Sequence, residues 1–324
     1  MVFKKLKPKP GEVIELSVNI AGPSTETLVQ YLTRRFAYLN EEEWTLRVKR
    51  GQVRVNERTA SIRQPLRAGD ALTYATAAWV EPEVNPAYRI LHEDESFLAI
   101  SKPSPLPVHA TGAYFQNTLT ALLKKDRPES RDWRLVHRLD SETSGLILVA
   151  KTSEALRKLQ HQWENRSVEK TYLALVFGRF EAESRVIDAP IGAPRYSRIR
   201  IKMGTDSVGG KPAVTRFLRL GVRGKFSLLQ VQPQTGRTHQ IRVHLEALGH
   251  PIVGDKLYSG EEEIFLRYVE EGWGDWIRDR VLLPRLALHA HRLRFRHPQD
   301  DREMTLEDPL PPELQAFWDS LQEA

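Results

Sequence analysis

Three short segments carry charged or aromatic side chains in places where a turn or a core would not require them. In HRLDSETSGLILVA (137–150), Arg138 and Asp140 stand in front of a seven-residue run that predicts a buried strand. Tyr172 lies in the strand-like EKTYLALVFG, and Arg242 lies near the start of an amphipathic helix in TGRTHQIRVHLEAL. A carboxylate, a phenol and a guanidinium can together support nucleophilic or acid–base chemistry beside a cation.

Each of these side chains also has a structural explanation when it is considered alone. Asp140 suits a turn, Tyr172 suits a strand that faces the core, and Arg242 can pair with Glu246 one helical turn later. The three segments therefore indicate chemistry only if the fold brings them together.

Several familiar catalytic and binding patterns are missing. There is no G-x-x-x-x-G-K-S/T, no G-x-G-x-x-G after a strand and no G-x-S-x-G, so Ser144 lacks the setting of an acyl-transfer nucleophile. His239 and His244 are five residues apart, which turns them away from a common helix face, and His289 and His291 share a strand face without a third ligand nearby. Because the sequence also lacks cysteine, we expect no metal site and no other cofactor.

The composition is that of a globular protein with a mild excess of positive charge. Hydrophobic residues make up 40% of the 324 residues and charged residues 28%, which predicts a folded core. The 48 Lys and Arg against 42 Asp and Glu give a net charge of +6, a modest preference for a polyanionic partner. No apolar run approaches the roughly 20 residues of a membrane span, and the N-terminus lacks a secretory signal. We expect a cytoplasmic protein with no membrane contact.

The elements that must position the three segments are predicted from the spacing of apolar residues. Short strands dominate after residue 88 and few helices separate them, which favours an α+β fold with a mostly antiparallel, mixed sheet. The predicted strands are 97–101, 145–150, 170–178, 213–220, 227–233 and 286–295. The predicted helices are 119–125, 153–165, 238–248 and 261–271, the last within an acidic, aromatic insertion at 261–279.

A smaller module is predicted before this region. Apolar residues at helical spacing predict a first helix behind Ser24 and Thr25, and Asn40 with Glu43 forms a capping box for a second helix. Residues 53–74 alternate and turn like a small hairpin. The predicted organisation is a tail with a short strand (1–24), the small domain (25–76), a linker (77–88) and a large domain (89–324).

The hairpin of the small module resembles a known nucleic-acid-binding domain. GQVRVNERTASIRQPLRAGD is similar to the hairpin of the S4-type RNA-binding domain, and the resemblance covers roughly residues 25–76. Its basic face would then contact phosphates rather than only solvent. The predicted RNA-binding residues are Arg34, Arg35, Arg47, Lys49, Arg50 and Arg54.

The large domain resembles the RluA family of pseudouridine synthases. HRLDSETSGLILVAK, EKTYLALVFG and TGRTHQIRVHLEALGHPIVGDKLY match its three successive catalytic motifs in order and spacing. The flanking segments KPSPLPVHATG and RLALHAHRLRFRHP extend the resemblance over roughly residues 85–300. The departures are Ser141, where a basic residue is common, and the insertion at 261–279. The resemblance implies an α+β catalytic domain of the pseudouridine synthase type.

The resemblance also implies roles for individual residues. Asp140 would be the essential carboxylate, acting on the ribose as a nucleophile or as a base, and Arg242 would be its ion-pair partner in preference to Arg237. Tyr172 would pack against the uracil, and Arg138 would fill the gap that an extracted base leaves in the RNA. Substrate-binding residues are predicted to be Arg138, His137, Arg237, Thr143 and Lys170, although a structural role is favoured for His137.

Alternatives remain open at this point. An S4-type module is common in relatives that modify large-subunit ribosomal RNA, whereas PVHATGAYFQNTLTALL resembles a segment of relatives that modify transfer RNA. A non-catalytic RNA-binding or ribosome-assembly protein is a second class. A glycosidase-like hydrolase is a third, which would need a paired carboxylate such as Glu142. We favour an RNA isomerase that works as a monomer, without a cofactor, on ribosomal RNA.

Overall fold

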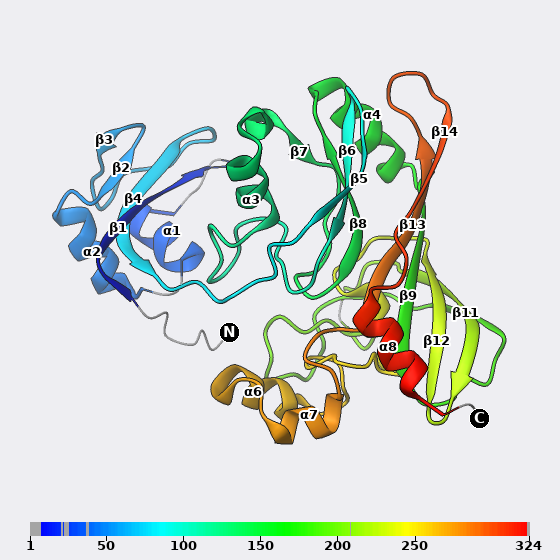
Figure 1. Cartoon of the computed structure of the whole chain (residues 1–324). Helices are drawn as coiled ribbons and strands as arrows, with labels where there is room; N and C mark the ends of the chain where they lie inside the picture. The colour runs from blue at the N-terminus through cyan, green and yellow to red at the C-terminus, as the bar shows by residue number, and fades with distance from the viewer. Residues whose placement is uncertain (1–7, 21, 23–25, 37–38, 208, 323–324) are drawn as a thin grey trace. The chain divides into compact units, whose positions relative to one another are not determined.

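A computed structural model describes residues 8–20, 22, 26–36, 39–207 and 209–322 (Figure 1). The chain divides into two compact units, one spanning Phe3–Glu81 and one that contains Pro82–Ala324; we call them the N-terminal and the C-terminal unit. Within the described residues, no helix has the length and apolar character needed to cross a membrane.

The N-terminal unit contains one antiparallel sheet and two helices. Its elements are β1 (Pro8–Asn19), α1 (Leu28–Arg35), α2 (Glu41–Lys49), β2 (Val53–Val55), β3 (Arg58–Thr59) and β4 (Ala71–Trp79). The strand order is β1-β4-β2-β3, so β1, which the sequence analysis placed in the tail, pairs with the last strand of the unit. β4 also extends three residues into the segment that was predicted as a linker.

The two helices of this unit begin at side-chain caps. Thr27 caps α1, whereas the predicted cap residues Ser24 and Thr25 lie outside the described residues. The predicted capping box of Asn40 and Glu43 at the start of α2 is confirmed. Trp44 is fully buried and packs edge-on against Tyr74, with ring centroids 5.2 Å apart.

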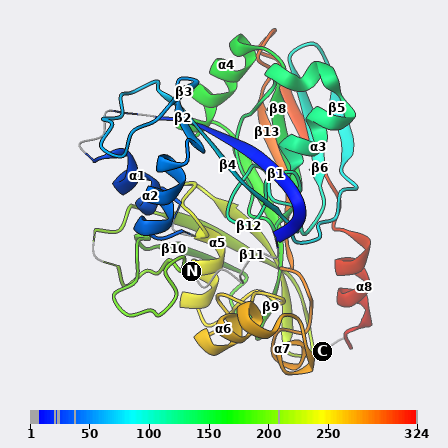
Figure 2. The same ribbon diagram turned by 90° about the vertical axis from the view of Figure 1, so that its left-hand side faces the viewer.

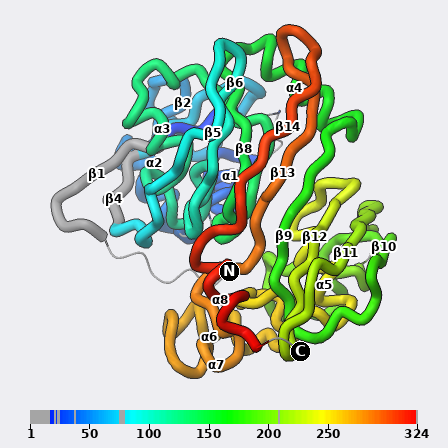
Figure 3. The backbone as a smooth tube through the Cα atoms, turned by 45° about the vertical axis from the view of Figure 1, so that its right-hand side comes forward, coloured from blue at the N-terminus to red at the C-terminus, as the bar shows by residue number. Residues whose placement is uncertain are grey.

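The C-terminal unit is built on a ten-stranded sheet, and the predicted α+β class is confirmed. Its strands are β5 (Arg89–Glu93), β6 (Phe97–Lys102), β7 (Arg134–Leu135), β8 (Ser144–Ala150), β9 (Glu169–Phe177), β10 (Ser184–Asp188), β11 (Val214–Arg223), β12 (Phe226–Pro233), β13 (Leu288–Arg296) and β14 (Glu303–Glu307). The main order is β10-β11-β12-β9-β13-β8-β6-β5. All pairings are antiparallel except that of β13 with β8, and Figure 3 shows β13 running between β8 and β9.

Both faces of the sheet are covered around β6 and β8, which explains why these strands are apolar without alternation. On one face, Phe97 and Leu148 pack in a cluster with Leu159 of α4 (Ser153–Glu164). On the other, Leu98 and Ile147 pack in a cluster with Leu119 and Leu123 of α3 (Leu119–Asp126). A strand buried on both faces needs apolar residues at successive positions. Both strands therefore form a rigid base for the loop that precedes β8.

The remaining helices lie around this sheet. They are the 3-10 helix η1 (Pro128–Asp132) and the α-helices α5 (Gln240–Ala247), α6 (Glu262–Glu271), α7 (Asp275–Val281) and α8 (Pro312–Ser320). The insertion at 261–279 forms α6 and the start of α7, which lie side by side at one end of the unit (Figure 2). Ile264, Ile277 and Val281 give this helix pair a small core of its own.

Gly145 determines how closely two central strands approach. It is the second residue of β8, it has a φ of +110°, and it pairs with Ala290 of the parallel strand β13. A Cβ at this position would collide with the backbone of Ala290. The glycine therefore allows β13 to lie against β8 where the loop of residues 136–143 enters the sheet.

Candidate functional site

The HRLD loop, residues 136–143, is fixed to the strand that follows it. The backbone N–H of Val136 donates to the carbonyl of Leu148 at 3.0 Å, and the N–H of Leu148 donates to Nε2 of His137 at 3.1 Å. The N–H of Thr143 donates to the carbonyl of Asp140 at 3.2 Å and closes a turn. Asp140 is thus presented from a short loop with backbone and side-chain anchors on β8.

His137 has a structural place in this loop. Its ring stacks on Trp163 of α4, with centroids 4.7 Å apart and planes 16° from parallel. Burial, with a contribution from the charge of Lys170, lowers the pKa of His137 to about 3. The ring is therefore neutral near pH 7 and can accept the N–H of Leu148. His137 therefore anchors the loop to β8 and α4, and its ring also borders the pocket described below.

Lys102 supports the loop from beneath. Its side chain is fully buried, and its Nζ donates to the carbonyls of Pro103, Leu106 and Ser141 at 3.0, 2.8 and 3.0 Å. Burial, together with the charge of Arg285, lowers the pKa of Lys102 to about 7. Because Ser141 follows Asp140 directly, Lys102 restrains the backbone of the residue next to Asp140.

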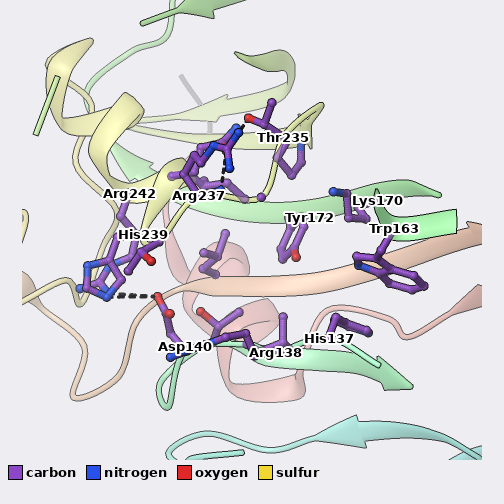
Figure 4. A pocket seen from close by; sticks show the side chains of 18 of the residues that line it. His137, Arg138, Asp140, Trp163, Lys170, Tyr172, Thr235, Arg237, His239 and Arg242 are labelled. Atoms are coloured by element: carbon purple, nitrogen blue, oxygen red, sulfur yellow. Dashed lines mark hydrogen bonds and ion pairs between the residues drawn. The ribbon is translucent and has the colours of Figure 1, made fainter. Parts of the chain in front are cut away.

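A pocket of about 320 Å³ opens beside this loop (Figure 4). It is lined by the HRLD loop, by β9 and by the segment that leads into α5. Every predicted catalytic or substrate-binding residue of the large domain borders it: Asp140, Tyr172, Arg242, Arg138, His137, Arg237, Thr143 and Lys170. The fold therefore gathers side chains from three segments that are far apart in the sequence.

Arg242 connects Asp140 to a second, buried carboxylate. Its Nη1 lies 3.1 Å from Oδ2 of Asp140, while its Nε and Nη2 donate to the two carboxylate oxygens of Asp255 at 2.7 and 2.9 Å. Asp255 is fully buried and also accepts the N–H groups of Leu257 and Tyr258. The guanidinium thus has one fixed partner and one partner that is 26% exposed to the pocket.

The charges around Arg242 keep it ionised. Burial opposes the charged form, but the carboxylates of Asp255 and Asp140 outweigh it and raise the pKa of Arg242. Burial likewise opposes ionisation of Asp255, but the guanidinium and two backbone N–H groups hold the pKa of Asp255 below its usual value. The ring of Tyr258 lies 4.8 Å from the guanidinium carbon and completes its packing. Arg242 is therefore held in one orientation before any substrate binds.

Tyr172 borders the pocket from β9. Burial, and after it the charge of Asp140, raises the pKa of Tyr172 well above its ordinary value. The hydroxyl therefore stays protonated near neutral pH, and the side chain presents a neutral ring. Lys170 lies two residues earlier on the same strand, so both side chains point to the same face of the sheet.

The other predicted residues differ in their surroundings. Arg138 is exposed and has no hydrogen bond or ion pair within the described part of the chain. Arg237 donates its Nε to the carbonyl of Pro212 at 3.1 Å and makes no contact with Asp140. Thr143 is buried at the floor of the turn. The predicted ion pair between Arg242 and Glu246 is wrong. Glu246 binds Lys202 at 2.9 Å, and Arg242 binds the carboxylates of Asp140 and Asp255 instead.

Sequence reasoning missed several residues that shape the site. Asp255 and Tyr258 lie in the quoted GDKLY segment but were given no role. The predicted helix start at Thr238 is also wrong, because α5 begins at Gln240 and His239 has a left-handed backbone with a φ of 58°. His239 binds Tyr258 Oη through Nδ1 at 2.8 Å and places Nε2 3.9 Å from Asp140. Burial, followed by the charge of Arg242, lowers the pKa of His239 to about 4.

The remaining histidines that were considered as metal ligands have structural partners. His244 binds the Thr215 hydroxyl at 2.8 Å, and His289 binds the Ser144 hydroxyl at 2.9 Å. His291 binds the carbonyl of Asp308 at 2.8 Å. Among the described residues, no group of three or more His, Cys, Asp or Glu side chains is arranged to hold a metal ion.

Comparison with known proteins identifies the family. A family model described as RNA pseudouridylate synthase matches residues 96–247. Ribosomal large subunit pseudouridine synthase C of Vibrio parahaemolyticus is 35% identical over 289 residues, which cover 86% of this chain and 87% of the relative. The chain belongs to the RNA pseudouridylate synthase family. The predicted resemblance to RluA-type pseudouridine synthases is thereby confirmed, as is the prediction of an isomerase.

Two further matches of this RNA pseudouridine synthase support the same family assignment. Ribosomal large subunit pseudouridine synthase D of Nitrosomonas europaea is 33% identical over 317 residues, or 95% of this chain and 88% of the relative. The structure of human RNA pseudouridylate synthase domain containing 1 matches with a TM-score of 0.58 and 30% identity, covering 73% of this chain and 90% of that one. Neither name refers to transfer RNA.

The surroundings of Glu142 bear on the hydrolase alternative for this enzyme. Its carboxylate accepts Lys256 Nζ at 2.7 Å and the N–H of Leu286 at 3.2 Å, and Glu142 is not part of the pocket lining. A glycosidase would need a second carboxylate across the pocket from Asp140. Glu142 is therefore in the wrong place to be that group.

The predicted RNA-binding residues of the N-terminal unit lie on α1, α2 and β2, except that Arg50 is the C-cap of α2. Arg35, Lys49 and Arg50 are exposed. Arg34 is also exposed, but its guanidinium is already paired with Glu26 at 2.8 Å. Arg47 lies 6.0 Å from the ring of Trp44, and Arg54 is half-buried on β2. Lys49 and Arg50 are neighbours at the C-terminal end of α2, and both side chains are exposed.

Proposed function

We propose that this enzyme converts uridine to pseudouridine in large-subunit ribosomal RNA and that Asp140 is its essential carboxylate. The observation that carries the proposal is Asp140 itself, which is partly exposed in a pocket and held by Arg242 at 3.1 Å. The choice of RNA rests on the names of relatives that this chain matches over 85% or more of their length, among them the enzymes of Vibrio parahaemolyticus and Nitrosomonas europaea.

The reaction needs a carboxylate at the sugar. The bond from the ribose C1′ to N1 of uracil breaks, the base rotates, and a new bond joins C1′ to C5, which then loses its proton. Asp140 acts on the ribose, either by attacking C1′ or by removing a ribose proton. Arg242 keeps the carboxylate oriented, and because Asp255 fixes the guanidinium, little reorganisation is needed when the substrate arrives.

Tyr172 and Arg138 hold the base and the RNA. The neutral ring of Tyr172 borders the pocket and packs against the uracil while it is detached from the ribose. Extraction of a base leaves a gap in the RNA stack, and the exposed guanidinium of Arg138, which has no ion pair with any described residue, fills that gap or binds the backbone beside it. The chemistry involves no net oxidation or hydrolysis, so no cofactor enters these steps.

The N-terminal unit binds RNA in this proposal. Its resemblance to an S4-type domain over residues 25–76, ahead of the catalytic domain proposed at 89–324, supports this assignment. Basic side chains on α1, α2 and β2 would pair with phosphates. Such contacts contribute affinity that does not depend on sequence, which leaves the choice of uridine to the pocket.

The test is a pseudouridine map of total RNA from cells with and without the gene. After carbodiimide treatment, reverse transcription stops at pseudouridines. The stops that depend on this enzyme should disappear from large-subunit ribosomal RNA in the deletion strain. They should return with the wild-type protein but not with Asp140→Asn. Purified Asp140→Asn should bind the same RNA within a few-fold of wild type, since the substitution keeps the size of the side chain.

Two results would contradict the proposal in different ways. An unchanged map in large-subunit ribosomal RNA, with stops lost from another RNA, would overturn the target but leave the reaction. Normal pseudouridine formation by Asp140→Asn would overturn the role of the carboxylate. Release of free uracil by the wild-type enzyme would instead indicate a hydrolase.

A further inference from the structure

The pocket continues beyond the place assigned to the target base. Figure 4 shows Asp140, His239 and Arg242 at one end, Tyr172 in the middle, and Lys170 and Trp163 at the other end. Lys170 and Tyr172 point to the same face from alternate positions of β9, whereas Trp163 comes from α4. Lys170 was predicted to bind substrate, but no part of the RNA has been assigned to this second end.

Lys170 carries a charge that no described side chain compensates. The partly or fully buried lysines of the C-terminal unit are Lys102, Lys151, Lys170, Lys202 and Lys256. Four of them have carboxylate or carbonyl partners at 3.0 Å or less. Lys170 has no hydrogen bond or ion pair within the residues that the structure describes, and its half-buried side chain borders the pocket.

An uncompensated cation in a pocket indicates a missing anion. Burial of a charge is costly unless a counter-charge or hydrogen bonds accompany it. Burial, and after it the like charge of Arg166, lowers the pKa of Lys170, which is the effect expected when no carboxylate is near. A bound phosphate would offset the cost of burying the charge and would raise the pKa of Lys170. A lysine ammonium is a suitable point charge for a phosphate.

The neighbouring side chains form an apolar wall beside this ammonium. Trp163 is held by its stack on His137, and His137 is held in turn by the N–H of Leu148 at 3.1 Å. Since the His137 ring is neutral, this wall adds no competing positive charge. The end of the pocket therefore combines one unpaired cation with a fixed aromatic surface, the two features that a nucleotide requires.

We propose that this end of the pocket is a second nucleotide subsite, in which Lys170 binds the phosphate next to the target uridine and Trp163 contacts that neighbouring nucleotide. The subsite rests on the proposed function, because it presumes that RNA enters the pocket. It adds a contact outside the reacting base, and it assigns that contact to the RNA backbone.

The first experiment measures the salt dependence of RNA binding by the full chain. Lys170→Gln should weaken binding of an RNA that contains the target uridine and reduce the slope of log K against log salt by about 0.7 to 0.9, the value for one lost phosphate contact. Lys170→Arg should keep the slope. The matched control is Lys151→Gln, a partly buried lysine paired with Glu93 away from the pocket, which should also keep it.

The second experiment locates the phosphate. The two phosphates flanking the target uridine are replaced one at a time by neutral methylphosphonates. At one position, the modified RNA should bind wild type as weakly as unmodified RNA binds Lys170→Gln, and the modification and the substitution together should cost no more than either alone. Full additivity at both positions would overturn the subsite.

The temperature of unfolding shows whether Lys170→Gln weakens RNA binding merely by destabilising the fold. Because the ammonium is unpaired, Lys170→Gln should unfold at the same temperature as wild type or higher. A clear drop would reveal a partner in the free protein and would overturn the inference. If wild type forms pseudouridine in the RNA but Lys170→Gln keeps the wild-type salt slope, the subsite is wrong and the proposed function stands. If wild type forms none, it is the proposed function that fails.

Discussion

At the residue scale, the site depends on a chain of three charged side chains. Asp140 borders the pocket and Arg242 binds Asp140, whereas among the described residues the side chain of Asp255 binds only Arg242 and backbone N–H groups. Asp255 is thus a positioning residue, since its carboxylate sets the direction of the guanidinium. A misplacement of about 1 Å in a catalytic group can cost on the order of 100-fold in rate.

We expect Asp255→Asn to slow pseudouridine formation on the order of 100-fold under single-turnover conditions while RNA binding changes little. The reason is that the guanidinium loses its charged, bidentate partner and no longer holds Asp140 in one orientation. The measurement is a double-mutant cycle with Arg242→Gln. In that background, Asp255→Asn should add little further loss.

A general loss of structure would give a different result. It would lower the rate of both backgrounds equally and would weaken RNA binding as well. Glu246→Gln is the matched control, because it breaks the Lys202 ion pair on the same helix without touching Arg242 or Asp140. Its single-turnover rate should remain close to wild type.

The residues of this chain were predictable to different degrees. Asp140 and Arg242 were expected to pair because both lie in segments that resemble family motifs, although 102 residues separate them. Asp255 follows Gly254 in a stretch that looks like an ordinary turn. Nothing in its spacing indicates that it contacts Arg242, since that contact requires the segment after α5 to fold back against β9, where the N–H of Val253 donates to the carbonyl of Leu175 at 2.9 Å.

At the element scale, the HRLD loop depends on its contact with β8 and α4. His137 accepts an N–H from β8 while stacking on Trp163, so it joins the loop to both elements. The two apolar strands β6 and β8 were predictable from continuous hydrophobic runs. The parallel pairing of β8 with β13 was not, because strand order depends on contacts far apart in sequence.

The buried, neutral His137 should make stability depend on pH. Its pKa of about 3 in the folded chain lies below the ordinary value of 6.5, so between these values the unfolded chain binds the proton and the folded chain does not. The stabilisation is complete above pH 6.5 and is lost as the pH falls towards 3. The slope contributed by this one group is about 1.4 kcal/mol per pH unit at most.

The measurement is the free energy of unfolding in urea at several pH values between 6.5 and 4. His137→Gln should show a shallower decline than wild type, because it removes one group that must take up a proton on unfolding. Trp163→Ala, which uncovers the ring, should flatten the same curve while keeping the histidine. Identical slopes in all three proteins would contradict this account.

At the scale of the whole molecule, the chain combines a basic N-terminal unit with the catalytic C-terminal unit. The helices and the hairpin of the N-terminal unit were predicted from the sequence. Its first strand was assigned to a tail, because the sequence of a single strand does not indicate which strand it pairs with. In the structure, β1 pairs with β4 at Pro8 and, after an irregularity, from Val13 to Asn19. If the unit binds phosphates, its contribution must appear in the salt dependence of RNA binding.

We expect the double substitution Lys49→Gln, Arg50→Gln to reduce the slope of log K against log salt by about 1.4 to 1.8, twice the value for one lost phosphate contact. Both side chains are exposed, so the fold should be unaffected. The matched control is Arg34→Gln, since that guanidinium is already paired with Glu26 and should contribute less. A slope equal to that of wild type would show that RNA does not reach this helix end.

The packing at Gly145 limits how such an enzyme can change over time. Side chains around the pocket could be exchanged to suit another uridine, because the strands beneath them would remain in place. The position just inside β8 has no such freedom, since any added carbon would push β13 away and tilt the loop that carries Asp140. A library that diversifies this region should therefore return many functional variants at the residues that line the pocket and almost none at Gly145.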